Sequence, residues 1–239
     1  ALLAWLMYRA RTNMAEHVQP VPVRKPTAPA NEAPAAMLLP KTVHASQRQA
    51  QQSVGIGMVK PRLQAGTALH FYGVRDLQMM PHQLVPQDSL TFKKGEHFVE
   101  IATAPPWFWP EVMKLDYDLL YLRAVTLSKN WIEVLVNRDT GRTAWIFRHA
   151  VDFMHWPDFL LEIYAVEIID PANNPLRIKP LSHASPIALP PRAQLRPLAI
   201  KGDWLRVAAV LDDAGQAGQT GWLRWRDGER LLIKFSLLN

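Results

Sequence analysis

The chain has 239 residues, 49% of them hydrophobic, which is enough for one or two domains with buried cores. It contains no cysteine, so disulfide bonds, iron–sulfur clusters, cysteine-ligated zinc and thiol catalysis are excluded. The net charge is +6, but the Lys and Arg residues are scattered along the chain, which does not favour nucleic acid as a partner.

The first 64 residues show no pattern of a folded domain. Ala1–Tyr8 is apolar and is followed by Arg9 and Arg11, which predicts the remnant of a membrane anchor or signal segment over residues 1–13. A short helical turn or a cloning remnant are the alternatives. Residues 14–64 are rich in Pro, Ala and Gln and predict an extended linker, because Pro fixes φ and has no backbone N–H. The folded body is expected to begin between Val54 and Leu69.

A first β-domain is predicted over residues 65–150. Short runs that alternate apolar and polar residues, or that are rich in β-branched and aromatic residues, indicate strands separated by tight turns. The predicted strands are 68–74, 89–92, 97–103, 119–126, 131–136 and 143–146. The Pro-framed aromatic segment 105–110 (PPWFWP) interrupts them, and it is not a central strand because Pro cannot donate to a ladder.

A second β-domain is predicted over residues 173–239, after a connector at 151–172. In the connector we expect a short turn at Pro157–Leu161 that leads into a strand. Asp227-Gly228 is typical of a hairpin turn. The predicted strands of this domain are 176–180, 193–200, 204–211, 221–225 and 231–235. Many short strands without a helical period indicate an all-β protein built of small barrels.

A tryptophan motif occurs in both domains. Gly202-Asp203-Trp204-Leu205-Arg206-Val207 is followed by Gly221-Trp222-Leu223, and Lys129-Asn130-Trp131-Ile132-Glu133-Val134 is followed by Thr143-Ala144-Trp145-Ile146. The recurrence suggests a duplicated β-domain. Because a large ring in mid-strand is good core material for a small barrel, the motif tryptophans are predicted to be core residues. They are Trp131, Trp145, Trp204 and Trp222.

These motifs resemble those of bacterial SH3-like (SH3b) domains, in which a strand G-[ND]-W-x-x-V is followed by a strand G-W-[IV]. The first copy departs from this pattern, with Lys129 in place of the leading Gly and Ala144 before the second Trp. From about Leu69 to Asn239 the chain is also similar to SH3-domain-containing proteins of Bacteroidetes, through WPDFLLEI, LRIKPLSHAS, DWLRV and LLIKFSLLN. The resemblance implies two small SH3-like β-barrels in tandem after the Pro/Ala-rich N-terminal segment. It also implies a periplasmic or membrane-anchored location in the cell envelope and a binding role.

No enzyme motif is present in the sequence. The eight histidines form no His-Glu-x-x-His pair, and there is no Gly-x-Ser-x-Gly or P-loop. Val54–Met58 contains two glycines but lacks the third glycine of a dinucleotide fingerprint. We therefore expect a protein that is not an enzyme and that has no metal or cofactor.

The candidate contact residues lie in and after the Pro-framed segment. Rigid aromatic groups in a loop bind peptides or sugars at low entropic cost, which favours Trp107, Phe108 and Trp109, with Tyr117 and Tyr121 as weaker candidates. The alternative is that the segment folds back as a plug between the domains.

Three functions are compatible with the sequence. The first is an envelope binding or scaffold protein that contacts a peptide, a glycan such as peptidoglycan, or a protein partner. The second is a structural subunit of a large membrane-associated envelope complex, with the Pro-rich segment wrapping a partner. Protection of residues 18–53 from proteolysis only within a complex would favour this second function. The third, nucleic-acid binding, rests on the pI and predicts a steep loss of affinity with salt.

Overall fold

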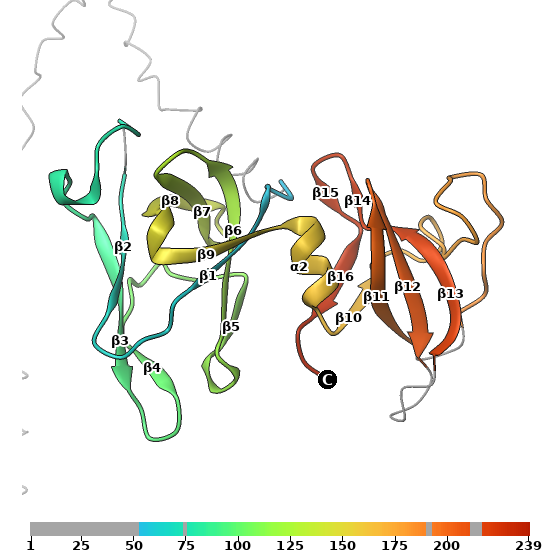
Figure 1. The fold of residues 1–239 in the computed structure, drawn as a ribbon, viewed down its shortest axis with the longest axis horizontal. Coiled ribbons are helices and arrows are strands. Elements are labelled where there is room, and N and C mark those ends of the chain that lie inside the picture. The colour runs from blue at the N-terminus through green and yellow to red at the C-terminus, as the bar shows by residue number, and fades with distance from the viewer. Residues whose placement is uncertain (1–52, 74–75, 190–192, 211–216) are drawn as a thin grey trace, which may run out of the picture. The chain divides into compact units, whose positions relative to one another are not determined.

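The computed structural model describes residues 53–73, 76–189, 193–210 and 217–239, all within one compact unit that begins at Pro40. The described chain is all-β, as predicted: antiparallel strands are accompanied by one short α-helix and three 3-10 helices (Figure 1). The predicted anchor remnant, residues 1–13, and most of the predicted linker lie outside the described residues. Within the described ranges, no helix is long and apolar enough to cross a membrane.

Residues 57–155, which we call the first lobe, contain nine strands and three 3-10 helices. They are β1 (Gly57–Pro61), β2 (Ala68–Phe71), η1 (Pro81–Gln83), β3 (Asp88–Lys94), β4 (Val99–Thr103), β5 (Val112–Lys114), η2 (Leu115–Tyr117), β6 (Leu119–Leu127), β7 (Trp131–Asn137), β8 (Arg142–Phe147), η3 (Arg148–Ala150) and β9 (Val151–His155).

Residues 165–239, the second lobe, follow helix α2 (Trp156–Glu162). Their strands are β10 (Ala165–Ile168), β11 (Gln194–Lys201), β12 (Trp204–Val210), β13 (Ala217–Arg224), β14 (Arg226–Asp227), β15 (Arg230–Leu231) and β16 (Ile233–Ser236).

The main sheets of the two lobes have the same strand order. The first is β8-β7-β6-β1-β9, with β5 also paired to β6, and the second is β13-β12-β11-β10-β16. In the first sheet β1 lies between β6 and β9, and β6, β7 and β8 form a meander. In the second sheet β10 lies between β11 and β16, and β11, β12 and β13 form a meander. Within the described residues neither sheet closes on itself, so the closed barrels predicted from the sequence are not formed there.

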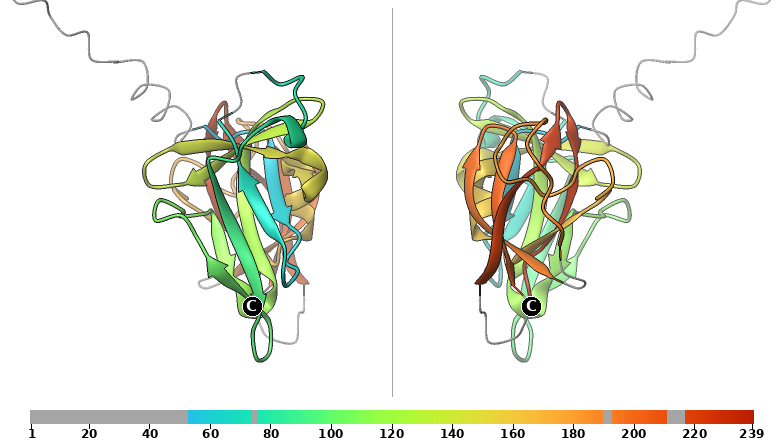
Figure 2. Two further views of the ribbon diagram at one scale, coloured as in Figure 1. Left: turned by 90° about the vertical axis from the view of Figure 1, so that its left-hand side faces the viewer. Right: turned by 90° about the vertical axis from the view of Figure 1, so that its right-hand side faces the viewer.

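The first lobe carries a large insertion between β1 and β6. Strands β2, β3 and β4 form a separate sheet, which is nearest the viewer in the left view of Figure 2. Its inner side chains, including Phe71, Leu90 and Phe92, share a hydrophobic core with Leu122 and Ile132 of the main sheet. The insertion therefore covers a face of the main sheet that would otherwise be exposed.

The motif tryptophans are not the shared core residues that we predicted. Side chains alternate along a strand, and in both copies the aliphatic residue after the first Trp, Ile132 or Leu205, is the one that is fully buried. Trp131 is also buried, because Tyr72 packs against it at 5.0 Å and its Nε1 donates to the Met79 carbonyl at 2.9 Å. The remaining three are only half-buried: Trp145, Trp204 and Trp222.

Helix α2 joins the two lobes. Pro157 occupies its first turn, where the missing N–H is harmless. Trp156 and Phe159 are buried in a hydrophobic core that contains Tyr121 of the first lobe and Trp225 of the second. The short turn expected at Pro157–Leu161 before a strand corresponds to α2 followed by β10, and residues 151–172 also supply β9.

Two further predictions are corrected by the strand bounds. Strand β1 lies inside the predicted linker, residues 14–64, yet it is central in its sheet, paired with both β6 and β9. Its five residues follow a Gln-rich stretch and include a glycine, so they carried little strand signal. Residues 176–180 do not form a strand: Arg177 makes isolated bridges to Trp222, through two backbone hydrogen bonds of 2.7 Å, and to Pro186.

Candidate functional site

The Pro-framed segment 105–110 is a loop, as predicted. It begins with a turn in which the Phe108 N–H donates to the Pro105 carbonyl at 3.0 Å. Trp109 then pairs with the end of β7, since its N–H donates to Val136 O at 2.8 Å and its carbonyl accepts from Arg138 N at 3.0 Å. These two bonds hold the backbone of Trp109 against the end of β7.

The three aromatic side chains of the segment have different environments. Phe108 is only 8% exposed and belongs to the core of the first lobe. Trp107 is half-buried, with an edge contact to Phe71 at 5.3 Å. Trp109 is 46% exposed. The segment is therefore anchored by Phe108 and presents Trp109 to solvent, which leaves little of the Phe108 surface for the contact role predicted from the sequence.

Two arginines from the β7–β8 hairpin lie over the two tryptophans. The Arg142 guanidinium carbon is 4.0 Å from the centre of the Trp107 ring, and that of Arg138 is 5.5 Å from the centre of the Trp109 ring. Such cation–π contacts are worth about 0.5–1 kcal/mol at exposed sites. These pairs could not be predicted from local sequence patterns, because they join residues about thirty positions apart.

A pocket of about 270 Å³ lies beside Trp109. It is lined by Trp109, Pro110, Glu111, Val112, Met113, Lys114 and Arg138. Met113 is 45% exposed, so the pocket carries apolar surface from Met113 and Trp109 next to the cationic groups of Lys114 and Arg138. A site of this size and composition suits a short piece of a larger partner.

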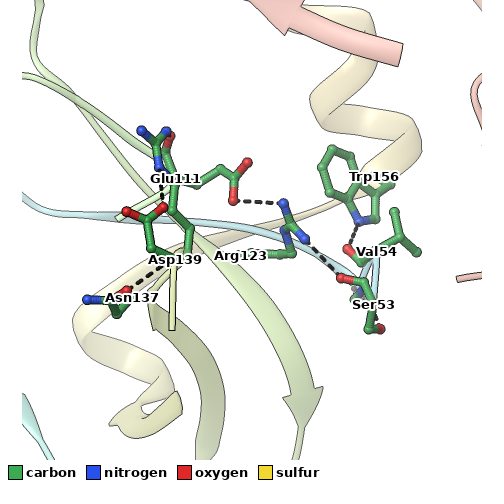
Figure 3. A network of polar contacts seen from close by, with 9 residues as sticks. Ser53, Val54, Glu111, Arg123, Asn137, Asp139 and Trp156 are labelled. Carbon is green, nitrogen blue, oxygen red and sulfur yellow. Dashed lines mark hydrogen bonds and ion pairs between the residues drawn. The ribbon is translucent and has the colours of Figure 1, made fainter. Parts of the chain in front are cut away.

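One wall of this pocket is held by a nearly buried ion pair (Figure 3). Arg123 Nη2 donates to Glu111 Oε2 at 2.8 Å, and the two side chains are only 11% and 14% exposed. Arg123 Nη1 donates to the Ser53 carbonyl at 2.9 Å, while its Nε is buried without a partner. A charged residue inside the apolar strand β6 (LLYLRAVTL) was the sequence signal for this role.

The same network reaches the joint between the lobes. Next to Ser53, the Val54 carbonyl accepts from Trp156 Nε1 of α2 at 2.7 Å (Figure 3). Ser53 Oγ donates to Glu229 Oε2 of the second lobe at 2.6 Å, and Val54 N donates to the Glu229 carbonyl at 2.7 Å. The chain segment at Ser53–Val54 thus contacts both lobes and α2.

The two tyrosines predicted as contact residues, Tyr117 and Tyr121, differ in burial. Tyr117 is 59% exposed on η2 and is not among the residues that line the pocket beside Trp109. Tyr121 is only 7% exposed, and its ring lies 5.4 Å from that of Phe159 in the joint. Burial raises the pKa of Tyr121. Tyr121 is therefore a core residue, with little surface left for the contact role predicted from the sequence.

A larger pocket, of about 610 Å³, lies in the second lobe. Residues of β10, β11 and β16 line it, together with Leu238 and Asn239 near the end of the chain. In the described part of the chain, no group of His, Asp and Glu residues is arranged to hold a metal ion. No family model and no curated protein matches the chain.

Proposed function

We propose that the protein is a non-enzymatic binding or scaffold protein of the cell envelope, and that the surface around Trp109 contacts its partner. The observation that carries the proposal is that Trp109 is 46% exposed on a backbone fixed by hydrogen bonds to β7. An aromatic ring that is already ordered loses little entropy on binding, and exposed Trp residues are frequent centres of binding energy. The partner is a peptide, a glycan such as peptidoglycan, or a protein.

The strand order supports an SH3-like assignment for both lobes within this proposal. In an SH3-like barrel the first strand pairs with the second and the last, which is the arrangement of β1 with β6 and β9, and of β10 with β11 and β16. A 3-10 turn before the last strand, as η3 before β9, fits the same assignment. The envelope location, periplasmic or membrane-anchored, rests on the sequence resemblance to SH3b domains.

A structural subunit of a large envelope complex is the second candidate function. It is favoured by large apolar side chains that are about half exposed on α2 and the second lobe: Leu161, Ile169, Ile178, Leu181 and Leu198. Fixed neighbours in an assembly would cover them. Proteolysis of residues 18–53 that is blocked only in a complex would favour this function over a modular binder.

Affinity capture with the full chain tests the leading proposal. The wild-type protein, Trp109→Ala and Phe98→Ala are immobilised and exposed to the same envelope extract and to purified peptidoglycan. Phe98 is the matched control, because it is 41% exposed on the β3–β4 hairpin. We expect Trp109→Ala to lose the captured partner and Phe98→Ala to keep it. Equal capture by all three proteins, or equal loss with both variants, would overturn the proposal.

A further inference from the structure

The pocket beside Trp109 is bordered by an open strand edge. In the described residues β5 pairs only with β6, through Val112, Met113 and Lys114. The other edge of such a strand carries backbone N–H and C=O groups without ladder partners, and an extended chain can pair with them. These three residues are also part of the lining of the pocket.

The charges around the pocket leave an excess of positive charge. Glu111 is neutralised by Arg123 at 2.8 Å. Asp139 lies 3.8 Å from Arg138, whose Nη1 also donates to the Glu111 carbonyl at 3.3 Å. Lys114 forms no ion pair with any described residue and is exposed. The rim of the pocket is therefore complementary to an anionic group.

Apolar contacts lie next to this positive rim. The exposed parts of Trp109 and Met113 face solvent at the same pocket. A ligand with an apolar side chain beside a carboxylate would match both features. Met113 and Lys114 are successive residues of β5, so their side chains point to opposite faces of the strand, as do successive side chains of a peptide paired with it. One extended peptide can therefore present an apolar side chain on one face and a carboxylate on the other.

We propose, building on the function above, that this pocket binds an extended acidic peptide segment of a partner protein. The peptide backbone pairs with the open edge of β5, an apolar side chain packs on Trp109 and Met113, and a carboxylate contacts Lys114 and Arg138. A glycan could stack on Trp109 and reach the cations, but it would make no use of the strand edge. A peptide uses the open edge of β5, the apolar surface and the positive rim of the pocket.

Binding of synthetic probes to the full chain tests this proposal. The probe is a labelled, acetylated peptide Val-Asp-Val-Glu-Val-Asp, measured by fluorescence anisotropy. Two matched peptides accompany it, one with Lys in place of each acidic residue and one N-methylated at alternate backbone nitrogens. We expect the acidic peptide to bind at least tenfold more tightly than either.

Protein variants locate the binding site. Lys114→Gln and Arg138→Gln should each weaken the acidic peptide about tenfold, as expected for loss of a charge-assisted contact. Lys94→Gln, which removes another exposed lysine on β3, should leave its affinity unchanged. Equal affinity for the acidic and basic peptides, or full competition by the acidic glycan polygalacturonate, would overturn the proposal.

The two proposals fail in distinguishable ways. If no peptide binds but Trp109→Ala still loses the captured partner, the acidic-peptide inference is wrong and the binding function stands. If no peptide binds and Trp109→Ala captures the same partners as the wild type, both are wrong.

Discussion

Arg123 is a charged residue in the interior of a β-sheet, and its role can be tested through its partner. Removing one member of a nearly buried ion pair leaves the other charge without compensation, at a cost of about 3 kcal/mol. We expect Arg123→Met to lower the free energy of unfolding by that amount in urea denaturation. The double variant Arg123→Met/Glu111→Gln should recover more than half of the loss. If the double variant loses as much free energy of unfolding as Arg123→Met and Glu111→Gln lose together, the two residues are not coupled.

Tyr121 predicts how stability depends on pH at the alkaline end. Burial raises its pKa in the folded state, with a smaller opposing effect of Lys60. The unfolded state ionises near pH 10, so this contribution is fully present below about pH 10 and is lost as pH rises toward the folded pKa. We expect Tyr121→Phe to flatten the fall in unfolding free energy between pH 9 and 11. Burial also raises the pKa of Tyr72, so Tyr72→Phe should remove a second part of the fall in unfolding free energy. An unchanged fall in both variants would contradict the assignment.

At the scale of elements, strand β1 depends on a glycine at a crowded position. A Cβ on Gly57 would lie 2.1 Å from the Met154 carbonyl oxygen of β9. Gly57→Ala must therefore push β1 away from β9, and we expect it to cost about 2–3 kcal/mol. Gly202 is the control, because it has a φ of +57° but no atom within 4 Å of the added Cβ. Gly202→Ala should cost only about 1 kcal/mol, from the left-handed backbone alone. Equal losses in urea denaturation would show that β1 is not packed as described.

The elements that the sequence predicted best were those with a strong local pattern. The hairpin at 131–136 and 143–146 was confirmed as β7 and β8, because alternation and turn residues agree there. Strand β1 was missed because a five-residue strand held between distant partners has little signal of its own. The alternation of side chains along a strand shows which residues share a face of the sheet, but it does not show which face is buried. Trp131 is buried because Tyr72, in the insertion between β1 and β6, packs against its ring.

The candidate site was predictable only in part. The prolines of the 105–110 segment correctly predicted a loop, but they did not predict which aromatic side chain is buried. Phe108 is buried and Trp109 is exposed. That difference depends on the core of the first lobe, which is built from residues distant in sequence. Arg123 inside the apolar strand β6 was a sequence signal of an internal charge, but its partner Glu111 could not be predicted, because the pairing depends on the tertiary fold and not on spacing.

At the scale of the whole molecule, α2 couples the two lobes. Phe159 is 1% exposed and contacts Tyr121 of the first lobe and Phe235 of the second, at ring distances of 5.4 and 5.1 Å. We expect the wild-type protein to unfold in one calorimetric transition that includes both lobes. Phe159→Ala should lower the free energy of unfolding by about 3–5 kcal/mol and separate the transitions of the lobes. Two transitions in the wild type would show that the joint is weak.

The proposed binding function assigns opposite roles to two neighbouring rings, Phe108 and Trp109. The most direct measurement takes Trp109→Ala and Phe108→Ala of the full chain and determines, for each, the urea midpoint and the captured partner. We expect Trp109→Ala to lose the partner with a nearly unchanged midpoint, and Phe108→Ala to lose about 3 kcal/mol of stability as a core truncation. A Trp109→Ala protein that unfolds as easily as Phe108→Ala, or that keeps its partner, would contradict the assignment of Trp109 as a contact residue.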